Sequence, residues 1–215
     1  MVRSDLPDPE PAASRVAVRH TEAAAPPRRR FTGTEWDRLV REGFFGPHER
    51  LELVNGEVRV MSPVGDPHAT VVYLAAEACR RAYSNRYLVR EEKPLAAGEQ
   101  RLYPDLVVVE GPPDRFLSRS PRGSEVALLM EVADSTLAYD LGEKAAIYAA
   151  ARVREYWVAD LNEGVLVVHH TPRRRRGLLH GWAYAEVREV GKGRLTPPGA
   201  RRAVGLSSFL RRAGR

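Results

Sequence analysis

Residues 103–109 read Tyr-Pro-Asp-Leu-Val-Val-Val, and residues 126–132 read Val-Ala-Leu-Leu-Met-Glu-Val. Short, nearly continuous apolar runs of this kind predict strands that are buried on both faces of a sheet. Each run carries one carboxylate, Asp105 in the first and Glu131 in the second. A carboxylate in such a run must pair with a cation, hold a metal ion or shift its pKa. The two runs therefore predict the centre of the fold and a charged site within it.

The bulk composition bounds the class of protein. The chain has 215 residues, of which 43% are hydrophobic and 29% charged, and this fits one globular domain with a buried core. No apolar stretch approaches the roughly 20 residues that a membrane helix needs, and no signal-peptide core is present. The single cysteine, Cys79, excludes an internal disulfide and a multi-cysteine zinc site. We therefore expect a cytoplasmic protein without membrane attachment, in which Cys79 is a buried helical residue.

The N-terminal region divides into a tail and a first helix. Residues 1–30 are rich in Pro, Ala and Arg and lack hydrophobic periodicity, so they predict a disordered tail. A single domain is expected over residues 31–215. Thr32 and Glu35 have the spacing of a capping box, which predicts a helix that ends near Arg41.

A hairpin and a long helix follow. Asn55-Gly56 favours a type I′ turn, because both residues tolerate positive φ, and it joins predicted strands at 50–54 and 57–61. Asp66 then offers an N-cap for a helix from about 68 to 83, with Pro67 at its first position. The inward-facing positions of this helix are expected to be Val71, Val72, Ala75, Ala78, Cys79 and Ala82.

The second half of the chain predicts more strands around one further helix. The segments are an extended stretch at 87–92, strands at 104–110 and 125–133, a helix at 141–152, a hairpin of 155–160 with 165–169, a strand at 182–190 and a short helix at 206–212. Apolar strands between helical segments indicate an α/β fold, with a central mixed sheet flanked by helices.

Asp105 and Glu131 are candidate metal ligands. Neighbouring strands would bring the two carboxylates to one divalent cation, and the backbone carbonyl of Val132 is a candidate third ligand. Such a site suits the hydrolysis of a phosphodiester bond, which needs an activated water and neutralised phosphate charge. Two other interpretations remain open: Pro104-Asp105 is only a turn, and Glu131 is only a paired charge in the core.

Lys144 is the candidate cationic residue of the site. The chain has 31 Arg but only three Lys, so each lysine invites a specific explanation. Asp140, Lys144 and Tyr148 share one face of the predicted helix, and Lys144 should lean back toward the strand that carries Glu131. Its ammonium could orient the attacking water or stabilise phosphate charge. The alternative is a surface ion pair between Asp140 and Lys144.

Charge is distributed unevenly along the chain. Residues 173–215 carry eleven Arg and one Lys against two Glu, a balance of +10, so residues 1–172 sum to 6 − 10 = −4. An acidic centre with a basic flank suits cations at a site and a polyanion as partner, and Arg173, Arg174, Arg175 and Arg176 are the candidate phosphate contacts. The alternative is that these arginines are merely solvated.

Several motifs in order resemble one family. They are Leu51-Glu52-Leu53-Val54-Asn55-Gly56-Glu57, Met61-Ser62-Pro63 with His68, Pro104-Asp105-Leu106-Val107-Val108, Glu131-Val132-Ala133-Asp134-Ser135-Thr136, Asp140-Leu141-Gly142-Glu143-Lys144 and Glu155-Tyr156-Trp157-Val158-Ala159-Asp160. In this order they resemble the Uma-two family of endonucleases, within the PD-(D/E)XK restriction-endonuclease-like superfamily. The resemblance covers about residues 32–170.

The resemblance implies a restriction-endonuclease-like fold and a DNA endonuclease that uses Mg²⁺ or Mn²⁺. Asp105 would be the Asp of the PD motif and Glu131 the acid of the second motif, both as metal ligands. Glu52 would be a third acid at the site, although a solvated hairpin residue is an equal alternative. His68 would contact a phosphate or a carboxylate that supports the metal ligands without binding the ion itself, although capping of its helix is the alternative.

One position departs from the superfamily pattern. The pattern places a lysine two residues after the second acid, where this chain has Ala133, so Lys144 would supply the ammonium from the following helix. This departure keeps a rival open, namely a catalytically silent nucleic-acid-binding or regulatory protein with the same fold. Hydrolysis of a smaller phosphoester is a third candidate. Cleavage of both strands of a duplex suits two active sites, and a homodimer would provide them.

Overall fold

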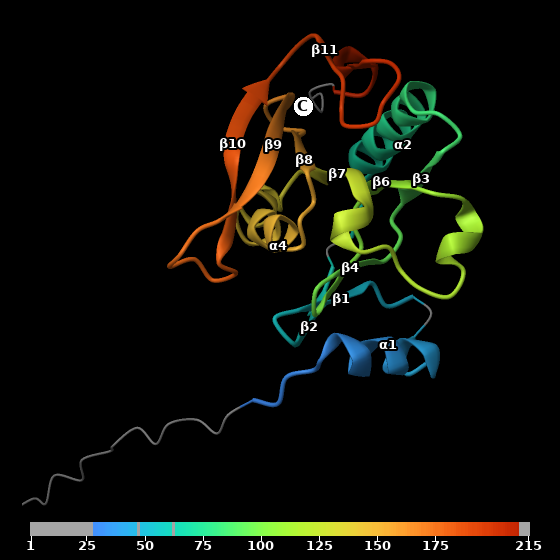
Figure 1. The fold of residues 1–215 in the computed structure, drawn as a ribbon, viewed down its shortest axis with the longest axis vertical. Helices are drawn as coiled ribbons and strands as arrows, with labels where there is room; N and C mark the ends of the chain where they lie inside the picture. Colours follow the sequence, from blue (N-terminus) through green and yellow to red (C-terminus); the bar gives the residue numbers. More distant parts are fainter. Residues whose placement is uncertain (1–27, 47, 62, 211–215) are drawn as a thin grey trace, which may run out of the picture.

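The computed structural model describes residues 28–46, 48–61 and 63–210, and Figure 1 shows how they are arranged. The tail predicted over residues 1–30 lies outside this part of the chain, except for residues 28–30. Among the described residues, no helix combines the length and the apolar character needed to cross a bilayer.

A six-stranded sheet forms the centre of the molecule, in the order β10-β9-β8-β7-β6-β3 (Figure 1). The strands are β3 (Tyr87–Glu91), β6 (Leu106–Glu110), β7 (Val126–Ala133), β8 (Glu155–Asp160), β9 (Val165–Arg174) and β10 (Trp182–Val190). All neighbours are antiparallel except β7 and β8, which are parallel. The two apolar runs of the sequence become the adjacent strands β6 and β7, and both are buried as predicted.

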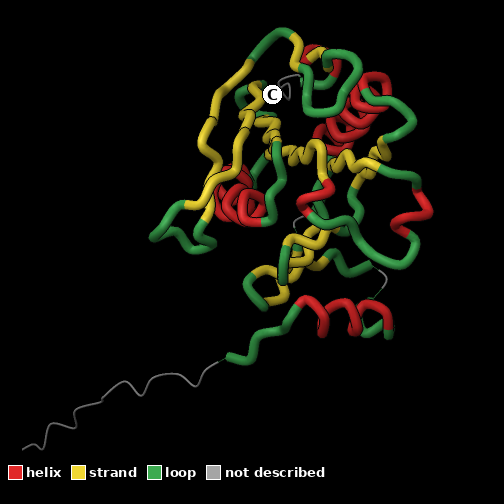
Figure 2. Tube along the Cα trace, viewed as in Figure 1, coloured by secondary structure: helices red, strands yellow, loops and turns green. Residues whose placement is uncertain are grey.

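Helical segments cover both faces of this sheet (Figure 2). On one face, α2 (Asp66–Ala82) packs its predicted inward positions against the core around Trp157. On the other face lies a segment made of α3 (Leu137–Tyr139), the π-turn η3 (Asp140–Lys144) and α4 (Ala145–Ala150). This segment connects β7 to β8, because two parallel neighbours require a crossover between opposite ends of the sheet. The predicted mixed sheet between helices is confirmed.

A second, four-stranded sheet adjoins the first in the order β2-β1-β5-β4. Its strands are β1 (Leu51–Val54), β2 (Glu57–Val60), β4 (Leu95–Ala97) and β5 (Gln100–Leu102). Asn55 and Gly56 have φ values of 53° and 77°, which confirms the type I′ turn between β1 and β2. Helix α1 (Gly33–Arg41) has the predicted capping box between Thr32 and Glu35, and its Trp36 packs against β1.

Strands β4 and β5 were not predicted from the sequence. Each is only three residues long, and the turn between them contains Gly98 with a φ of 67°. Strands this short carry too little alternation to be recognised, and they form here because β5 pairs with β1. The small remaining elements are η1 (Pro113–Phe116), η2 (Gly123–Glu125), β11 (Arg194–Leu195), β12 (Val204–Gly205) and η4 (Leu206–Ser208).

Several predicted boundaries are wrong. Gly65, not Asp66, is the N-cap of α2, and it makes no side-chain capping bond, so Asp66 and Pro67 fill the first two helical positions. The helix predicted at 141–152 overlaps a helical segment that begins earlier, at Leu137, and also ends earlier, at Ala150. The predicted closing helix is only the short η4, and residues 211 and 212 lie outside the described residues.

Two glycines of positive φ allow a matched test of the β1–β2 turn. A Cβ at Gly56 would lie 2.5 Å from Arg30 Cβ, whereas a Cβ at Gly43 meets nothing within 4 Å, and both residues have positive φ (77° and 70°). Gly43→Ala should therefore cost only the backbone strain, about 1 kcal/mol of unfolding free energy. Gly56→Ala should cost about 2 kcal/mol or more, since it adds the steric clash. Urea denaturation measures both values, and equal losses would contradict this account of the turn.

Candidate active site

Asp105 and Glu131 meet at the end of the β6–β7 ladder. The register pairs Leu106 with Met130, so the next residues, Asp105 and Glu131, come opposite each other. The Asp105 N–H donates to Glu131 Oε2 at 3.3 Å, and the two side chains belong to residues that are only 6% and 2% exposed. The prediction that these acids lie side by side in the centre of the fold is therefore matched by the geometry.

The π-turn delivers Lys144 to the same point. Lys144 Nζ lies 2.9 Å from Glu131 Oε1 and 3.4 Å from Asp140 Oδ1. Tyr148, one turn further, donates its hydroxyl to Glu131 Oε1 at 2.6 Å. The shared helical face of Asp140, Lys144 and Tyr148 is thus real. Because Asp140 and Lys144 are 2% and 7% exposed, the alternative of a surface ion pair is wrong.

Glu52 belongs to the same cluster. All four residues of β1 are buried, Glu52 among them at 3% exposure, so the alternative of a solvated hairpin residue is wrong. Glu52 Oε1 accepts a hydrogen bond from the N–H of Tyr103 at 3.0 Å. The carboxylate therefore enters the site from the small sheet, whereas Asp105 and Glu131 enter it from the large one.

His68 lies beside Asp105, in the first turn of α2. Its Nε2 is 3.1 Å from Asp105 Oδ2, and its Nδ1 is a buried ring nitrogen without a hydrogen-bond partner among the described residues. Burial opposes protonation, but the hydrogen bond and charge of Asp105 outweigh burial and raise the pKa of His68. The imidazole therefore contacts a carboxylate, as one interpretation of the sequence held, and it does not cap the helix.

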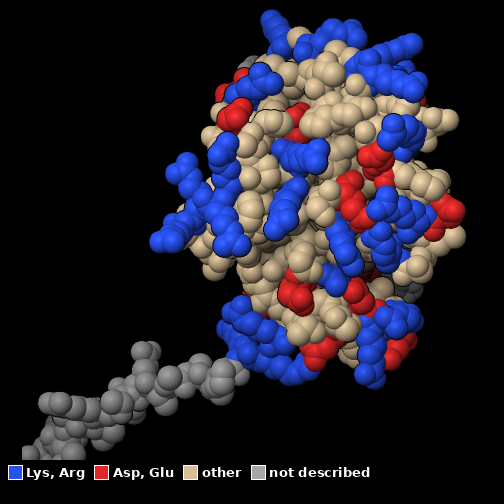
Figure 3. All heavy atoms as spheres, viewed as in Figure 1, with Lys and Arg blue, Asp and Glu red and all other residues tan. Residues whose placement is uncertain are grey.

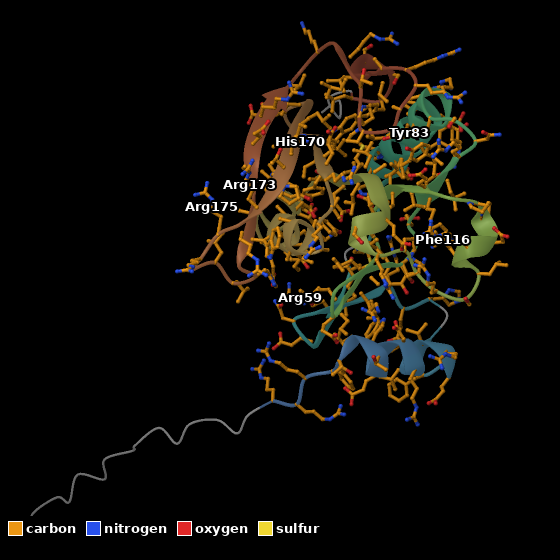
Figure 4. All side chains as sticks on the ribbon, in the orientation of Figure 1. Arg59, Tyr83, Phe116, His170, Arg173 and Arg175 are labelled. Atoms are coloured by element: carbon orange, nitrogen blue, oxygen red, sulfur yellow. The ribbon has the colours of Figure 1, made fainter. Side chains whose placement is uncertain are left out.

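These side chains line a single cavity of about 300 Å³. Its polar lining also includes Arg50, Arg59 and Tyr139, and its apolar lining includes Val60, Met61 and Pro63. Arg59 Nη1 makes an ion pair with Glu143 Oε2 at 2.7 Å, and Figure 4 shows Arg59 between the small sheet and the helical segment. The cavity therefore opens between the two sheets, and residues from both of them shape it.

Acidic groups outnumber basic groups in this cavity. Four of its residues are buried carboxyl-bearing ones, namely Glu52, Asp105, Glu131 and Asp140, and one is a buried lysine. Burial raises the pKa of Glu131 well above its usual value, Lys144 opposes this, and the neighbouring carboxylates add to it. Burial also acts to lower the pKa of Lys144, but the surrounding carboxylates outweigh it and raise that pKa. The ammonium is thus held charged, and the surplus of negative charge favours binding of a further cation.

The donor set suits a hard divalent cation. Carboxylate and carbonyl oxygens are the ligands that Mg²⁺ prefers. The Val132 N–H donates to Asp105 Oδ2 at 2.7 Å. Because the N–H and C=O of a strand residue point to the same side, the Val132 carbonyl points toward Asp105 too. If the β6–β7 pairing continued, Pro104 would lie opposite Val132. Proline has no N–H, so it cannot donate a hydrogen bond to the Val132 carbonyl.

The ligand set is not prearranged around an ion. Among the described residues, no group of three or more His, Cys, Asp or Glu side chains is disposed to hold a metal. Both Glu131 oxygens already accept hydrogen bonds, one from Lys144 and Tyr148 and the other from the Asp105 N–H. A cation would therefore draw on two side chains, a carbonyl and water, and it would compete with Lys144 for Glu131.

The arginine run lies apart from this cavity. Arg173 and Arg174 end β9, Arg175 and Arg176 follow it, and all four are exposed. None of them lines the cavity. In Figure 4, Arg173 and Arg175 lie on the outer side of the β9–β10 hairpin, where Figure 3 shows basic side chains gathered.

Three further residues of the site, Arg59, Tyr139 and Glu143, had no predicted role. Glu143 accepts hydrogen bonds from Asn55 Nδ2 at 2.7 Å and from Arg59, and so ties the small sheet to the π-turn that carries Lys144. The Tyr139 ring has the Arg59 guanidinium and the Lys144 ammonium each at 5.5 Å from its centroid. The only signal in the sequence was the placement of Tyr139 and Glu143 next to Asp140 and Lys144.

Comparison with known proteins identifies relatives of this chain. Residues 35–194 match the model of the Uma2 family, described as "Putative restriction endonuclease". Among solved structures, a "putative nuclease belonging to DUF820 from Anabaena variabilis ATCC 29413" superposes with a TM-score of 0.59 at 13% sequence identity, covering 84% of this chain and 97% of that one. Among curated proteins, none matches. The fold is therefore the restriction-endonuclease-like one.

Removal of the Lys144 ammonium tests the charge balance of the cavity. Lys144→Met leaves Glu131 and Asp140 buried without a cation, so with EDTA present it should lower the free energy of unfolding by about 3 kcal/mol. The double variant Glu131→Gln, Lys144→Met should be more stable than Lys144→Met, because it removes the Glu131 charge that Lys144→Met leaves buried without a partner. Urea denaturation of the three proteins measures both effects. A loss under about 0.5 kcal/mol in Lys144→Met would show that the pair is not a structural constraint.

Proposed function

The chain belongs to the Uma2 family of nucleases, and on that premise we propose that it is a metal-dependent DNA endonuclease that hydrolyses phosphodiester bonds. One observation carries the proposal: two carboxylates from adjacent strands and an ammonium 2.9 Å from one of them share a buried cavity. Phosphodiester hydrolysis requires these groups, because charge at the phosphate must be neutralised and a water must be oriented.

Asp105, Glu131 and the Val132 carbonyl would hold the metal ion, Mg²⁺ or Mn²⁺. When bound, the ion supplies Lewis-acid polarisation of the phosphate and lowers the pKa of a bound water. The protein's part is to hold the oxygens in place. Hydrogen bonds from the Val132 N–H to Asp105 and from Tyr148 to Glu131 orient the two carboxylates. His68 Nε2 lies 3.1 Å from the same oxygen, Asp105 Oδ2, and helps to hold it in place.

Lys144 would stabilise negative charge on the phosphate and orient the attacking water. A lysine can act as a base only after its pKa falls, but the carboxylates around Lys144 raise it. The residue therefore acts as a fixed positive charge and a hydrogen-bond donor. Ala133, in the usual place of the lysine, is fully buried on the strand, and Lys144 reaches Glu131 from the crossover helix instead. Glu52 adds negative charge on the small-sheet side of the cavity.

DNA would approach the cavity mouth between the two sheets. Arg50 and Arg59 lie in the cavity lining, where they could hold phosphates that flank the scissile one. Arg173 to Arg176, on the β9–β10 hairpin, would add contacts farther along the duplex. Both groups bind phosphate without reading bases, so the affinity for DNA would depend on salt more than on sequence.

A catalytically silent, DNA-binding form of the same fold is the second candidate. It is favoured by one observation, namely that Lys144, Tyr148 and a backbone N–H already donate hydrogen bonds to the two oxygens of Glu131. A site closed in this way is stable without a cation. The two candidates differ in whether a divalent ion displaces part of this network.

Plasmid nicking with Mg²⁺ or Mn²⁺ separates the two candidates. The wild-type protein should convert supercoiled plasmid to open circles, and Glu131→Gln and Lys144→Met should each lose this activity, by about 100-fold or more. Lys192→Met is the matched control, because Lys192 is exposed and lies outside the cavity, and it should stay active. Absence of nicking by the wild type, together with salt-sensitive DNA binding, would establish the silent form.

Metal binding separates the role of Lys144 from that of Glu131. Calorimetric titration with Mn²⁺ should show that Glu131→Gln loses affinity for the ion, because a neutral amide replaces one of the two carboxylates that would bind it. Lys144→Met should keep or gain affinity, since the competing ammonium is gone. If Lys144→Met abolished metal binding, the assignment of this residue to the phosphate and water would be wrong.

The arginine run can be tested by the salt dependence of DNA binding. Replacing Arg173 to Arg176 by Gln should lower the slope of log affinity against log salt by about 0.9 for each phosphate that the variant no longer neutralises. The rate of nicking at saturating DNA should not change, because these residues lie outside the cavity. Arg38→Gln with Arg41→Gln, on the exposed side of α1, is the matched control. An unchanged slope in the fourfold variant would mean that the run is only solvated.

A further inference from the structure

Strand β10 (Trp182–Val190) forms an open edge of the central sheet. It pairs with β9 on one side, and in the described part of the chain no strand pairs with its other side. Figure 1 shows β10 at the outer margin of the sheet. An edge of this kind presents a row of N–H and C=O groups that can extend the sheet with a strand from another chain.

The middle of β10 is uncovered on both faces. Residues 185–189 are all exposed, although successive residues of a strand point to opposite faces. Val187 is 56% exposed. Beside it runs a groove of about 950 Å³ between β10 and α4, lined in part by Leu178, Leu179, Trp182 and Val187. An open strand edge with exposed apolar side chains beside it is typical of an interaction surface.

The charges on this edge suit a second copy of the same strand. In a twofold dimer whose two sheets join edge to edge, one residue of β10 sits on the axis and faces its own copy. A centre at Glu186, Arg188 or Glu189 would set like charges against each other. A centre at Val187 sets Glu186 of each copy opposite Arg188 of the other, so two ion pairs flank a contact between valines.

We propose that β10 is the contact through which two copies of this chain associate, antiparallel and centred on Val187, so that their six-stranded sheets become one. Opposite charges on this edge attract the second copy, whereas an edge protected against association carries charges of one sign or a proline. The valines and the groove beside α4 supply the apolar part of the contact.

This arrangement would place two cavities on the same face of the joined sheet. The strand registers bring Glu131 level with Glu189, through Val158 and Val167. With strands about 4.8 Å apart, and β7 three strands from β10, the two copies of Glu131 would lie roughly 35 Å apart. This is about one turn of B-DNA. The use of both cavities on one duplex rests on the proposed nuclease function, but the dimer itself does not.

A charge exchange tests both the contact and its register. The wild type should sediment as a dimer in analytical ultracentrifugation at low salt. Glu186→Arg and Arg188→Glu should each give monomers, because each sets like charges against each other at both flanking positions. An equal mixture of the two variants should form dimers again, since each then finds opposite charges in its partner. The double variant Glu186→Arg, Arg188→Glu should also dimerise.

Any one of three results would overturn the proposal. The first is a wild-type protein that remains monomeric up to concentrations on the order of 100 µM. The second is a mixture of the two variants that stays monomeric, and the third is a single variant that dimerises as the wild type does. Circular dichroism checks that each variant is folded. Because Glu186 and Arg188 lie outside the active-site cavity, single-strand nicking by the variants reports separately on the nuclease function.

Discussion

The buried ion pair between Lys144 and Glu131 is the interaction on which the rest of this structure depends. It joins the crossover helix to the central strand at 2.9 Å, where neither charge could remain alone without a large desolvation cost. Around the pair, Asp105, Asp140 and Glu52 bring further negative charge into the same cavity. The protein thus keeps a surplus of anionic groups at the centre of its fold. That surplus costs stability, and buried charges of this kind are typical of functional sites rather than of packed cores.

Much of this site could be predicted because charge stands out in apolar strands. Asp105 and Glu131 were recognisable as unusual residues within buried runs, and the spacing of Asp140, Lys144 and Tyr148 gave the correct face of the helix. The turn at Asn55-Gly56 was recognisable for a stereochemical reason, since few other residues tolerate two successive positive φ values. In each of these cases, the residues close together in the sequence were sufficient for the prediction.

What the sequence could not predict depends on contacts between distant segments. Strands β4 and β5 are too short to have a pattern of their own and exist through pairing with β1. Glu143 and Arg59 are 84 residues apart in the sequence, and the residues around each of them give no indication of their contact. The π-turn also has no signature in the sequence, although it carries the buried Asp140 and Lys144. The position of Arg173 to Arg176 could not be predicted for a different reason. The composition gives the charge of this segment but not its distance from the cavity.

The parallel pairing of β7 and β8 has a consequence for the evolution of such sites. Ala133 on β7 belongs to the apolar cluster on the α4 face of the sheet, and Lys144 on the crossover reaches Glu131 on that face. A long cationic side chain could be anchored at either position and still deliver its charge to the same carboxylate. Lineages could therefore exchange one anchoring point for the other without rebuilding the scaffold. The position of the ammonium beside the carboxylate determines the chemistry, and the backbone residue that carries the ammonium can differ.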